Sequence, residues 1–416
     1  MTDRGGFAAL DSCVHCGFCL QACPTFLATG DEADSPRGRI ELMRALEAGE
    51  LSPDDPNLAQ HLDRCLGCRG CEPVCPSGVG YGRGLEAARA LMTERRGAPT
   101  VVRVALAVLT GSGLSRIAYA LAGALRATGI PGRLAGWGRI RFALGMLAAT
   151  KPVRNAEFGM RNRGSPVNSA FRTPHSALTS VSLFRGCVME GLFSHVHDAT
   201  IRTLAVNGYS VREVPEQACC GALHAHAGLR EQARRLASAN VAAFTGEDLI
   251  VVNSAGCGAM LKEYGHLVDD AGERFAARVR DVSELLAERG PRPGAPLDTT
   301  VAYDPPCHLL HAQRIAEPPE RLLSAIPVLR VTPLVDAAQC CGSAGLFTLV
   351  EPAMSRAVLA PKLAALAQAR PQVVVTGNPG CLMQLGAGLA AAGLPLVARH
   401  PVELLDESYR AAGYYA

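Results

Sequence analysis

Two cysteine strings near the start of the chain constrain its fold more than any other feature. Residues 13–23 read C-x2-C-x2-C-x3-C followed by a proline, and residues 65–75 repeat the pattern with its own proline. This run is typical of bacterial iron-sulfur domains, in which the fourth cysteine of each string binds the other cluster. The proline fixes φ, has no N–H, and turns the chain away after the last thiolate. The strings therefore predict one small domain that holds two 4Fe-4S clusters close together.

The crossed pattern divides the eight N-terminal cysteines into two ligand sets. Zinc sites usually take their ligands as two separated pairs, unlike four cysteines within eleven residues. A disulfide framework is disfavoured because residues 1–12 show neither the basic nor the apolar region of a secretory signal. The expected sets are Cys13, Cys16, Cys19 and Cys75 for the first cluster, and Cys65, Cys68, Cys71 and Cys23 for the second.

A helix is expected directly after the first string. Ser35 can cap it and Pro36 suits its first turn, with a helical pattern from Ile40 to about residue 48. Arg37 and Arg39 at its entrance either offset the negative charge of thiolate-bound clusters or simply face solvent. A second helical pattern runs from residue 85 to about residue 96.

The part of the chain after residue 179 is an internal duplication. Each copy has an apolar strand-like run ending near a cysteine, then a Cys-Cys-Gly triplet, then a second apolar run and a fourth cysteine. Apolar runs that alternate with helical stretches predict α/β halves with parallel sheets, whose ligand sites lie at the carboxyl ends of the strands. We expect the two halves to face one another around a pseudo-two-fold axis.

The eight later cysteines have three open interpretations. They hold one iron-sulfur cluster per copy, or share a single cluster, or are buried inert thiols. His224, His226 and His308 lie close to them in sequence, and either add ligands or serve as structural hydrogen-bonding groups. The candidate metal ligands of the repeats are Cys187, Cys219, Cys220, Cys257, Cys307, Cys340, Cys341 and Cys381.

A strongly basic segment separates the cysteine strings from the duplication. Residues 95–156 hold ten Lys or Arg and no Asp or Glu. The longest uncharged run in the apolar part of this segment has twelve residues, 104–115, which is too short to span a bilayer. The segment predicts basic amphipathic helices that lie on an anionic membrane or dock a partner, or else a basic solvent face. Residues 151–178 are expected to form a linker.

These patterns predict a multidomain chain of mixed α+β and α/β class. The net charge of +3 is too small to indicate a nucleic-acid partner. The expected domains are a helical two-cluster ferredoxin-type domain over 1–94, a basic helical segment and linker over 95–178, a first cysteine-rich repeat over 179–294, and a second over 295–416.

Several stretches resemble one known family. They are CVHCGFC with ACPT, GDEADSPRGRI, HLDRCLGCRGCEPVCPSGVGY, SAGCGAMLKEYG, CCGSAG and the NPGC element. Together they resemble the iron-sulfur subunits of bacterial glycolate oxidase, also called glycolate dehydrogenase. Subunits of lactate utilisation, anaerobic glycerol-3-phosphate dehydrogenase and heterodisulfide reductase share part of the pattern. PRGRI and KEYG favour the glycolate family.

The resemblance implies a role in electron transfer. The chain is expected to carry electrons from glycolate oxidation to glyoxylate, performed on FAD-binding partner subunits, toward a membrane quinone or another acceptor. It implies 4Fe-4S clusters on the eight N-terminal cysteines, no flavin on this chain, and a location in the cytoplasm or peripherally on the cytoplasmic face of the inner membrane. Lys262, Glu263 and Tyr264 of the KEYG element are candidates for a subunit interface.

One departure and two rival functions stay open. Repeats of the heterodisulfide type end in C-x-x-C, but Ser254 and Asn378 replace the first cysteine here, so each copy has four thiols. This counts against an unusual non-cubane cluster. One rival function is a catalytic subunit whose repeats reduce a disulfide or oxidise a hydroxyacid. The other is a docking scaffold with buried thiols.

Overall fold

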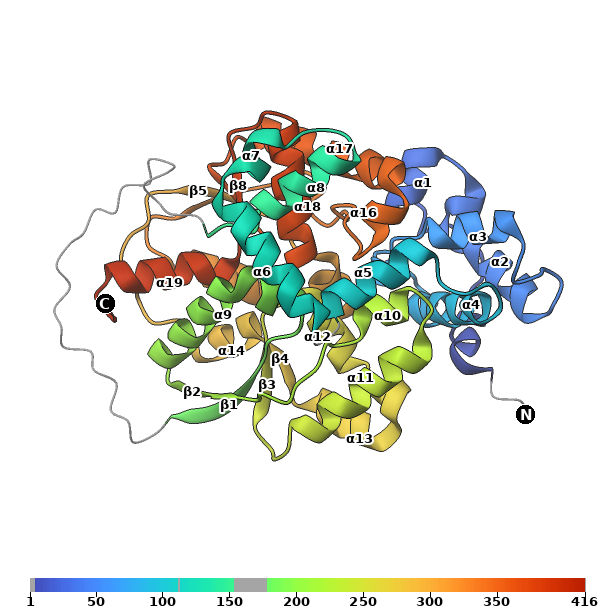
Figure 1. Ribbon diagram of the computed structural model, residues 1–416, viewed down its shortest axis with the longest axis horizontal. Coiled ribbons are helices and arrows are strands. Elements are labelled where there is room, and N and C mark those ends of the chain that lie inside the picture. Colours follow the sequence, from blue (N-terminus) through green and yellow to red (C-terminus); the bar gives the residue numbers. More distant parts are fainter. Residues whose placement is uncertain (1–3, 111–112, 153–177, 416) are drawn as a thin grey trace.

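The computed structural model describes residues 4–110, 113–152 and 178–415. Helices of the cysteine-string region lie at one end of the molecule, and two α/β halves make up most of the rest (Figure 1). Helices of the basic segment run across the face of both halves in this view. The predicted linker elements at residues 164–166, 168–169 and 174, together with Arg154, lie outside the described residues.

The regular elements that the structure describes in the N-terminal domain are all helices. Ser35 caps α2 through its Oγ, which accepts a hydrogen bond from the Gly38 N–H at 3.0 Å. The helix therefore begins at Pro36, as its predicted cap and first-turn proline indicate. The next predicted helix begins earlier than expected, at Tyr81 instead of residue 85. Gly84 lets this helix pack closely on Leu10, because a Cβ there would lie 2.5 Å from that side chain. The elements are η1 Gly5–Leu10, α1 Pro24–Thr29, η2 Glu32–Asp34, α2 Pro36–Glu47, α3 Pro56–Asp63 and α4 Tyr81–Arg96.

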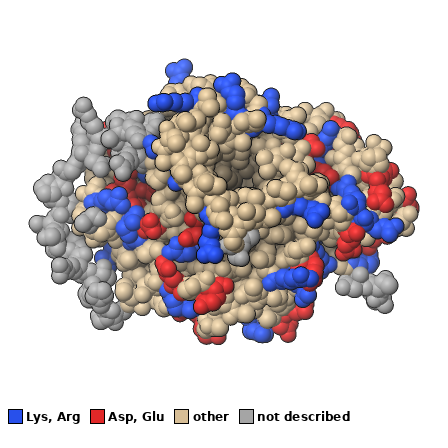
Figure 2. All heavy atoms as spheres, viewed as in Figure 1, with Lys and Arg blue, Asp and Glu red and all other residues tan. Residues whose placement is uncertain are grey.

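The basic segment forms four helices that pack on the α/β halves. They are α5 Thr100–Thr110, α6 Leu114–Ala127, α7 Ile130–Leu134 and α8 Arg139–Ala148. Helix α6 contacts α9 of the first half, and α8 contacts α18 of the second. Lys and Arg side chains gather along the upper edge of the molecule, where α7 and α8 lie (Figure 2). Within the described part of the chain no single helix could cross a membrane, although α5 and α6 pass by length and composition as a bent pair.

The two halves have parallel sheets with the same strand order. The first is β2-β1-β3-β4 and the second is β6-β5-β7-β8. Strand β3 reads Leu-Ile-Val-Val and β7 reads Val-Val-Val, as expected of parallel strands buried on both faces. The duplication and the parallel α/β layout are confirmed. The strands are β1 Thr179–Phe184, β2 Tyr209–Glu213, β3 Leu249–Val252, β4 Val279–Asp281, β5 Thr300–Tyr303, β6 Arg330–Thr332, β7 Val373–Val375 and β8 Val397–Arg399.

The helices of the halves also follow matching orders. The first half, called the first repeat, has α9 Val188–Val206, α10 Ala222–His226, α11 Arg230–Ala243, α12 Ala255–Lys262, α13 Gly265–Ala277 and α14 Val282–Arg289. The second repeat has the π-helix η5 His308–Ala312, α15 Glu317–Ser324, α16 Phe347–Val350, α17 Pro352–Ala369, α18 Pro379–Ala391 and α19 Pro401–Ala411.

The repeats share one apolar core and contact each other reciprocally. Helix α9 packs on α19, while α15 packs on α14. Helices α14 and α19 both follow the last strand of their repeat and both begin with a capping box. Each contact therefore joins the last helix of one repeat to a helix that follows the first strand of the other repeat, as expected for a pseudo-two-fold arrangement. Side chains of β1, β3, β5 and β7 meet in the same buried cluster.

Candidate iron-sulfur sites

The first expected cysteine set lines one small cavity at the outer part of the N-terminal domain. Its volume is about 30 Å³, and all four expected thiols line it. Positive φ angles at His15 and Gly17 shape the loop between the first three thiols. His15 contacts Glu41 at 2.8 Å, so its ring is engaged with helix α2. The side chains of Val14 and Phe18 are 70% and 68% exposed on the same loop.

The second expected set lines another cavity, deeper in the molecule. Its volume is about 20 Å³, and the thiols on its wall include Cys23 from the first string and three from the second. The loop over 65–71 takes positive φ at Gly67 and Arg69. Cys65 Sγ accepts hydrogen bonds from the Gly67 N–H at 3.4 Å and the Tyr81 hydroxyl at 3.5 Å. Soft thiols that converge on a small cavity suit a cubane cluster, and hydrogen bonds to the sulfurs tune its potential.

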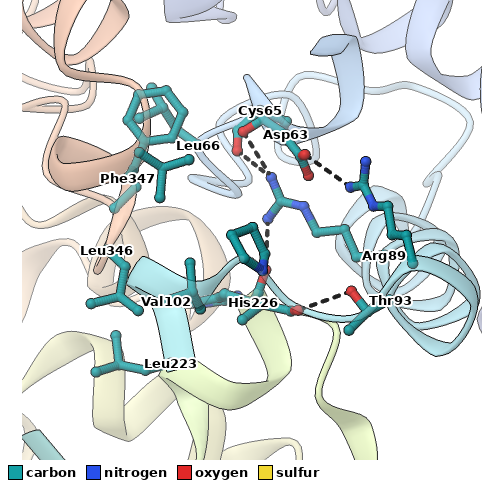
Figure 3. Close-up of a pocket in the computed structure, with 15 residues that line it drawn as sticks. Asp63, Cys65, Leu66, Arg89, Thr93, Val102, Leu223, His226, Leu346 and Phe347 are labelled. Atoms are coloured by element: carbon teal, nitrogen blue, oxygen red, sulfur yellow. Dashed lines mark hydrogen bonds and ion pairs between the residues drawn. The ribbon is translucent and has the colours of Figure 1, made fainter. Parts of the chain in front are cut away.

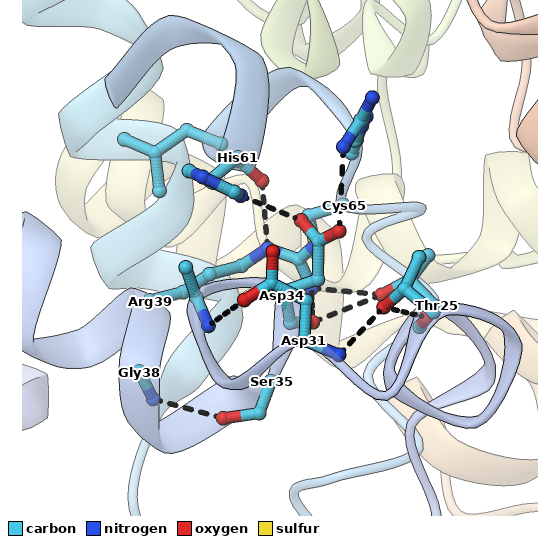
Figure 4. A network of polar contacts seen from close by, with 12 residues as sticks. Thr25, Asp31, Asp34, Ser35, Gly38, Arg39, His61 and Cys65 are labelled. Carbon is cyan, nitrogen blue, oxygen red and sulfur yellow. Dashed lines mark hydrogen bonds and ion pairs between the residues drawn. The ribbon is translucent and has the colours of Figure 1, made fainter. Parts of the chain in front are cut away.

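A buried positive charge lies beside the second cavity (Figure 4). Arg39 is fully buried and pairs with the equally buried Asp34 at 3.1 Å. Its guanidinium lies 4.0 Å from Cys23 Sγ and donates to Thr25 Oγ1 at 2.9 Å. Burial alone lowers the pKa of Arg39, but the neighbouring Cys65, Tyr81, Cys23 and Asp34 raise it above its ordinary value. The side chain is therefore a permanent cation next to this thiol set.

The other arginine at this helix entrance has a different environment. Arg37 pairs with Glu32 at 2.6 Å on the surface. Arg37 also lines the first thiol cavity, and its pKa is raised by Glu32 and by the neighbouring Cys19 and Cys16. Of the two sequence-based alternatives, charge compensation therefore applies to both arginines, with Arg39 buried and Arg37 half-exposed. Asp31, Asp34 and His61 also lie within 4.8 Å of one another, but Arg39 and Arg64 already pair with Asp34, so this group is an ion-pair network.

The four thiols of each repeat gather beyond the carboxyl ends of its strands. In the first repeat, Cys187 Sγ lies 3.3 Å from Cys219 Sγ, and Cys220 is within hydrogen-bonding reach of Cys257. Hydrogen bonds from Cys187 and Cys220 hold the pKa of Cys219 well below its ordinary value. This placement agrees with the expected position of ligands in parallel α/β folds.

The second repeat reproduces this array and adds one thiol from outside. Cys307 Sγ lies 4.0 Å from Cys340 Sγ, and Cys341 is within hydrogen-bonding reach of Cys381. Cys340 also contacts Cys68 of the N-terminal domain. Hydrogen bonds from Cys307, Cys341 and Cys68 hold the pKa of Cys340 well below its ordinary value. Sequence reasoning missed this contact because no local pattern links the two positions.

The three candidate histidines are placed differently from one another. His308 hydrogen-bonds through Nε2 to the Gly67 carbonyl at 3.2 Å, and His226 stacks on it with ring centroids 5.5 Å apart. These two rings lie at the junction between domains. His224 is buried near Cys219, and its Nδ1 has no hydrogen-bond partner among the described residues. It is the one histidine of the three that stays a candidate ligand.

The KEYG residues make contacts within the chain. Glu263 forms an ion pair with Arg69, and Lys262 pairs with Glu284 at 2.9 Å. Tyr264 is fully buried and donates to the Cys220 carbonyl at 2.9 Å. Tyr264 is therefore enclosed within this chain, and the subunit-interface interpretation does not apply to it; for Lys262 and Glu263 it stays a prediction. Glu263 holds the N-terminal domain against the first repeat, and Tyr264 supports the thiol loop of that repeat.

A further cavity lies where the N-terminal domain meets both repeats (Figure 3). Its volume is about 100 Å³, and Leu66, Val102, Leu223 and Phe347 form part of its apolar wall. Arg89 crosses it and donates to the carbonyls of Cys65 at 2.6 Å and His226 at 3.2 Å. Sequence reasoning missed Arg89, because an arginine in a helical pattern carries no signal that distinguishes a buried crosslink from a solvent-facing charge.

Comparison with known proteins identifies the family. Residues 9–79 match a 4Fe-4S dicluster domain, and residues 181–262 and 301–386 match a cysteine-rich domain. The chain is 35% identical to the probable glycolate oxidase iron-sulfur subunit of Bacillus subtilis, over 97% of this chain and 94% of that protein. It is 32% identical to the glycolate oxidase iron-sulfur subunit of Escherichia coli, over 96% and 94%. The chain belongs to the glycolate oxidase iron-sulfur subunit family.

Membership in the glycolate oxidase iron-sulfur subunit family confirms the predicted class of function. The chain is an electron-transfer subunit with iron-sulfur domains, as its dicluster match indicates. The chain is 29% identical to lactate utilization protein A of Geobacillus kaustophilus, over 54% of this chain and 98% of that protein. The near-complete coverage by glycolate oxidase subunits therefore agrees better with the whole architecture.

Proposed function

We propose that this chain is the electron-transfer subunit of a flavin-dependent glycolate dehydrogenase complex. FAD-binding partner subunits oxidise glycolate to glyoxylate, and this chain passes the electrons to a membrane quinone or another acceptor. The observation that carries the proposal is the pair of thiol cavities in the N-terminal domain, one near the surface and one buried against the second repeat. Two clusters there would divide the electron pair into single-electron steps.

The eight N-terminal cysteines would hold these clusters in the crossed arrangement. Each cavity is lined by four expected thiols, and one of the four comes from the other string. When bound, a cubane in each cavity supplies a one-electron carrier whose potential depends on charge, hydrogen bonds and exposure. Arg39, Tyr81 and the Gly67 N–H supply such contacts at the second site. The thiol array of each repeat would hold a further iron-sulfur centre.

The exposed loop of the first site suits the flavin-binding partner. Cys16 is exposed, and the apolar side chains of Val14 and Phe18 flank it in solvent. An apolar rim next to a redox site provides a docking surface that excludes water on contact. Electrons would then enter at the first site and leave it toward the second.

Replacing Phe18 with aspartate is expected to weaken binding of the flavin-binding subunits about 30-fold. This is the effect of losing ~2 kcal/mol of binding free energy from a side chain at the centre of an interface. The affinity is measured by titrating the purified partner and following glycolate-driven dye reduction. Val335→Asp is the matched control, because Val335 is 64% exposed on the second repeat. Equal weakening by both variants, or none by Phe18→Asp, would contradict this docking surface.

The basic helical segment suits an anionic membrane surface. Its exposed apolar side chains include Ile117, Leu121 and Ile140, and residues 95–156 contain no acidic residue. Amphipathic helices with this composition lie in the interfacial plane of a bilayer. Exposed arginines beside these side chains add attraction to anionic lipid of about 1 kcal/mol each. They are Arg103, Arg116, Arg133, Arg139 and Arg141.

The full chain is expected to sediment with phosphatidylcholine vesicles only when they contain phosphatidylglycerol, and to be released by salt because exposed charges are screened. The double variant Ile117→Asp/Leu121→Asp should lose this binding at least tenfold, since it removes apolar contact and adds repulsion. Val331→Asp/Val335→Asp, two exposed positions of the second repeat, is the control. Binding that ignores lipid charge, or survives the α6 substitutions, would exclude this membrane surface.

The function is tested by anaerobic purification of the complex from its own cells. Dye reduction is compared with glycolate, D-lactate, L-lactate and glycerol 3-phosphate. We expect activity with glycolate and a co-purifying flavoprotein. Activity with only another substrate would move the chain to a related complex, and the absence of any flavoprotein would overturn the electron-transfer assignment.

A further inference from the structure

The N-terminal domain contacts the two repeats unequally. On the first repeat it binds through α4 and through Arg69, with Arg89 and Thr93 donating to the carbonyls of His226 and Ala227. On the second repeat, α1 contacts α17, and the loop between the thiols of the N-terminal domain lies against the thiols of the repeat. Leu66 and Cys68 pack in one apolar cluster with Cys307 and Cys340. Because a single N-terminal domain contacts the two repeats in different ways, the pseudo-two-fold symmetry of the repeats does not extend to this domain.

The contact on the second repeat is held by neighbours of thiols on both sides. His308, next to Cys307, bonds to the carbonyl of Gly67, next to Cys68. Gln339, next to Cys340, donates to the Gln21 carbonyl at 3.2 Å. Gly70 also lies against this repeat, because a Cβ there would be 3.5 Å from His311. These contacts fix the position of the Cys68 sulfur relative to Cys340.

The equivalent thiol of the first repeat is covered by a different part of the chain. Cys219 corresponds to Cys340 in the duplication, and both are buried. Tyr119 of α6 lies near Cys187 and Cys219, where burial and these thiols raise its pKa. Among the described contacts of Cys219, the thiol partners are Cys187 and Cys220, both from its own repeat. The first array is therefore covered by the basic helical segment.

We propose that the Cys68–Cys340 contact is the route by which single electrons pass between the second cluster of the N-terminal domain and a metal centre on the thiols of the second repeat. Within the described residues, the thiol neighbours of the equivalent Cys219 include none from the N-terminal domain, so the first repeat has no equivalent route there. This inference rests on the proposed function, which places iron-sulfur centres on both thiol sets. In each transfer one centre loses one electron and the other gains it, with no bond made or broken and no proton transferred. Electronic coupling falls steeply with distance, so the packing of Cys68 and Cys340 in one buried cluster outweighs any longer path.

Cys340→Ser and Cys219→Ser are the matched test, because they occupy equivalent buried positions. Iron content and electron paramagnetic resonance are measured on the anaerobically reduced full chain. Both variants should lose iron relative to wild type. A magnetic interaction with the centre of the second repeat should broaden the ferredoxin-type signals and speed their relaxation. Only Cys340→Ser should abolish this interaction. Equal loss of that interaction in both variants, or in neither, would overturn the inference.

The iron measurement separates two questions: whether the repeats hold metal centres, and whether only the second repeat is connected to the N-terminal clusters. If neither variant loses iron, the repeats hold no centre and the inference fails, while electron transfer by the two N-terminal clusters stands. If both lose iron but the spectra change equally, the repeats hold centres and only the unequal connection fails. Should Cys340→Ser not fold, the wild-type chain is poised at stepwise potentials instead. The relaxation of the ferredoxin-type signals should then change as the repeat centre is reduced, and constant relaxation would contradict the contact.

Discussion

Replacing Cys68 with serine is expected to reduce glycolate-driven electron transfer to acceptors beyond the flavin by about 100-fold or more. Removal of a cluster ligand has a larger effect than removal of a residue that only hydrogen-bonds to a ligand. Reduction of the flavin by glycolate should persist, since the proposed function places the reaction of the substrate on partner subunits. Stopped-flow absorbance of the complex separates the two steps. The effect is large because Cys68 serves both the second thiol cavity and the contact with Cys340.

Cys16→Ser provides the comparison for this result. Cys16 lines the first cavity and is exposed, far from the contact with the second repeat. It should also stop transfer beyond the flavin, but it should leave the magnetic interaction with the second repeat intact. Retained transfer in both variants would contradict an electron path through the N-terminal domain.

Replacing Arg39 with methionine is expected to destabilise the protein by about 3–5 kcal/mol, because it leaves the buried Asp34 without its paired charge. Removing a cation 4.0 Å from Cys23 Sγ should also lower the reduction potential of the cluster bound there, since the reduced cluster is more negative. Denaturant unfolding of the anaerobic protein and a spectroscopic redox titration measure the two effects.

Arg37→Met is the matched control for this substitution. Arg37 lies two residues away on the same helix, but its ion pair with Glu32 is exposed, so its loss should change stability by about 0–1 kcal/mol. Combining Arg39→Met with Asp34→Leu should recover part of the stability, because both buried charges are then removed. Equal effects of Arg37→Met and Arg39→Met would show that burial of the pair has no special role.

Features encoded by short spacing could be predicted from the sequence. The crossed grouping follows from two strings in which two or three residues separate successive cysteines, and the structure brings each expected set to one cavity. The duplicated parallel halves follow from apolar runs of strand length, each followed by a cysteine at a matching offset. Helix α2 begins at Pro36, as predicted from the Ser35 cap and the first-turn proline, because capping depends on residues that are adjacent in the sequence.

Features that depend on contacts between distant segments were decided by the tertiary structure alone. Arg37 and Arg39 look equivalent in sequence, and only packing against Asp34 and His61 buries one of them. The hydrogen bond from His308 to Gly67 joins positions 241 residues apart, and no local pattern connects Cys68 with Cys340. The sequence by itself determined which thiols group within each unit, because the spacing of the ligands is written in two short strings of the same pattern. Which repeat contacts Cys68 was decided by how whole surfaces fit, because the two repeats offer nearly the same cysteine pattern.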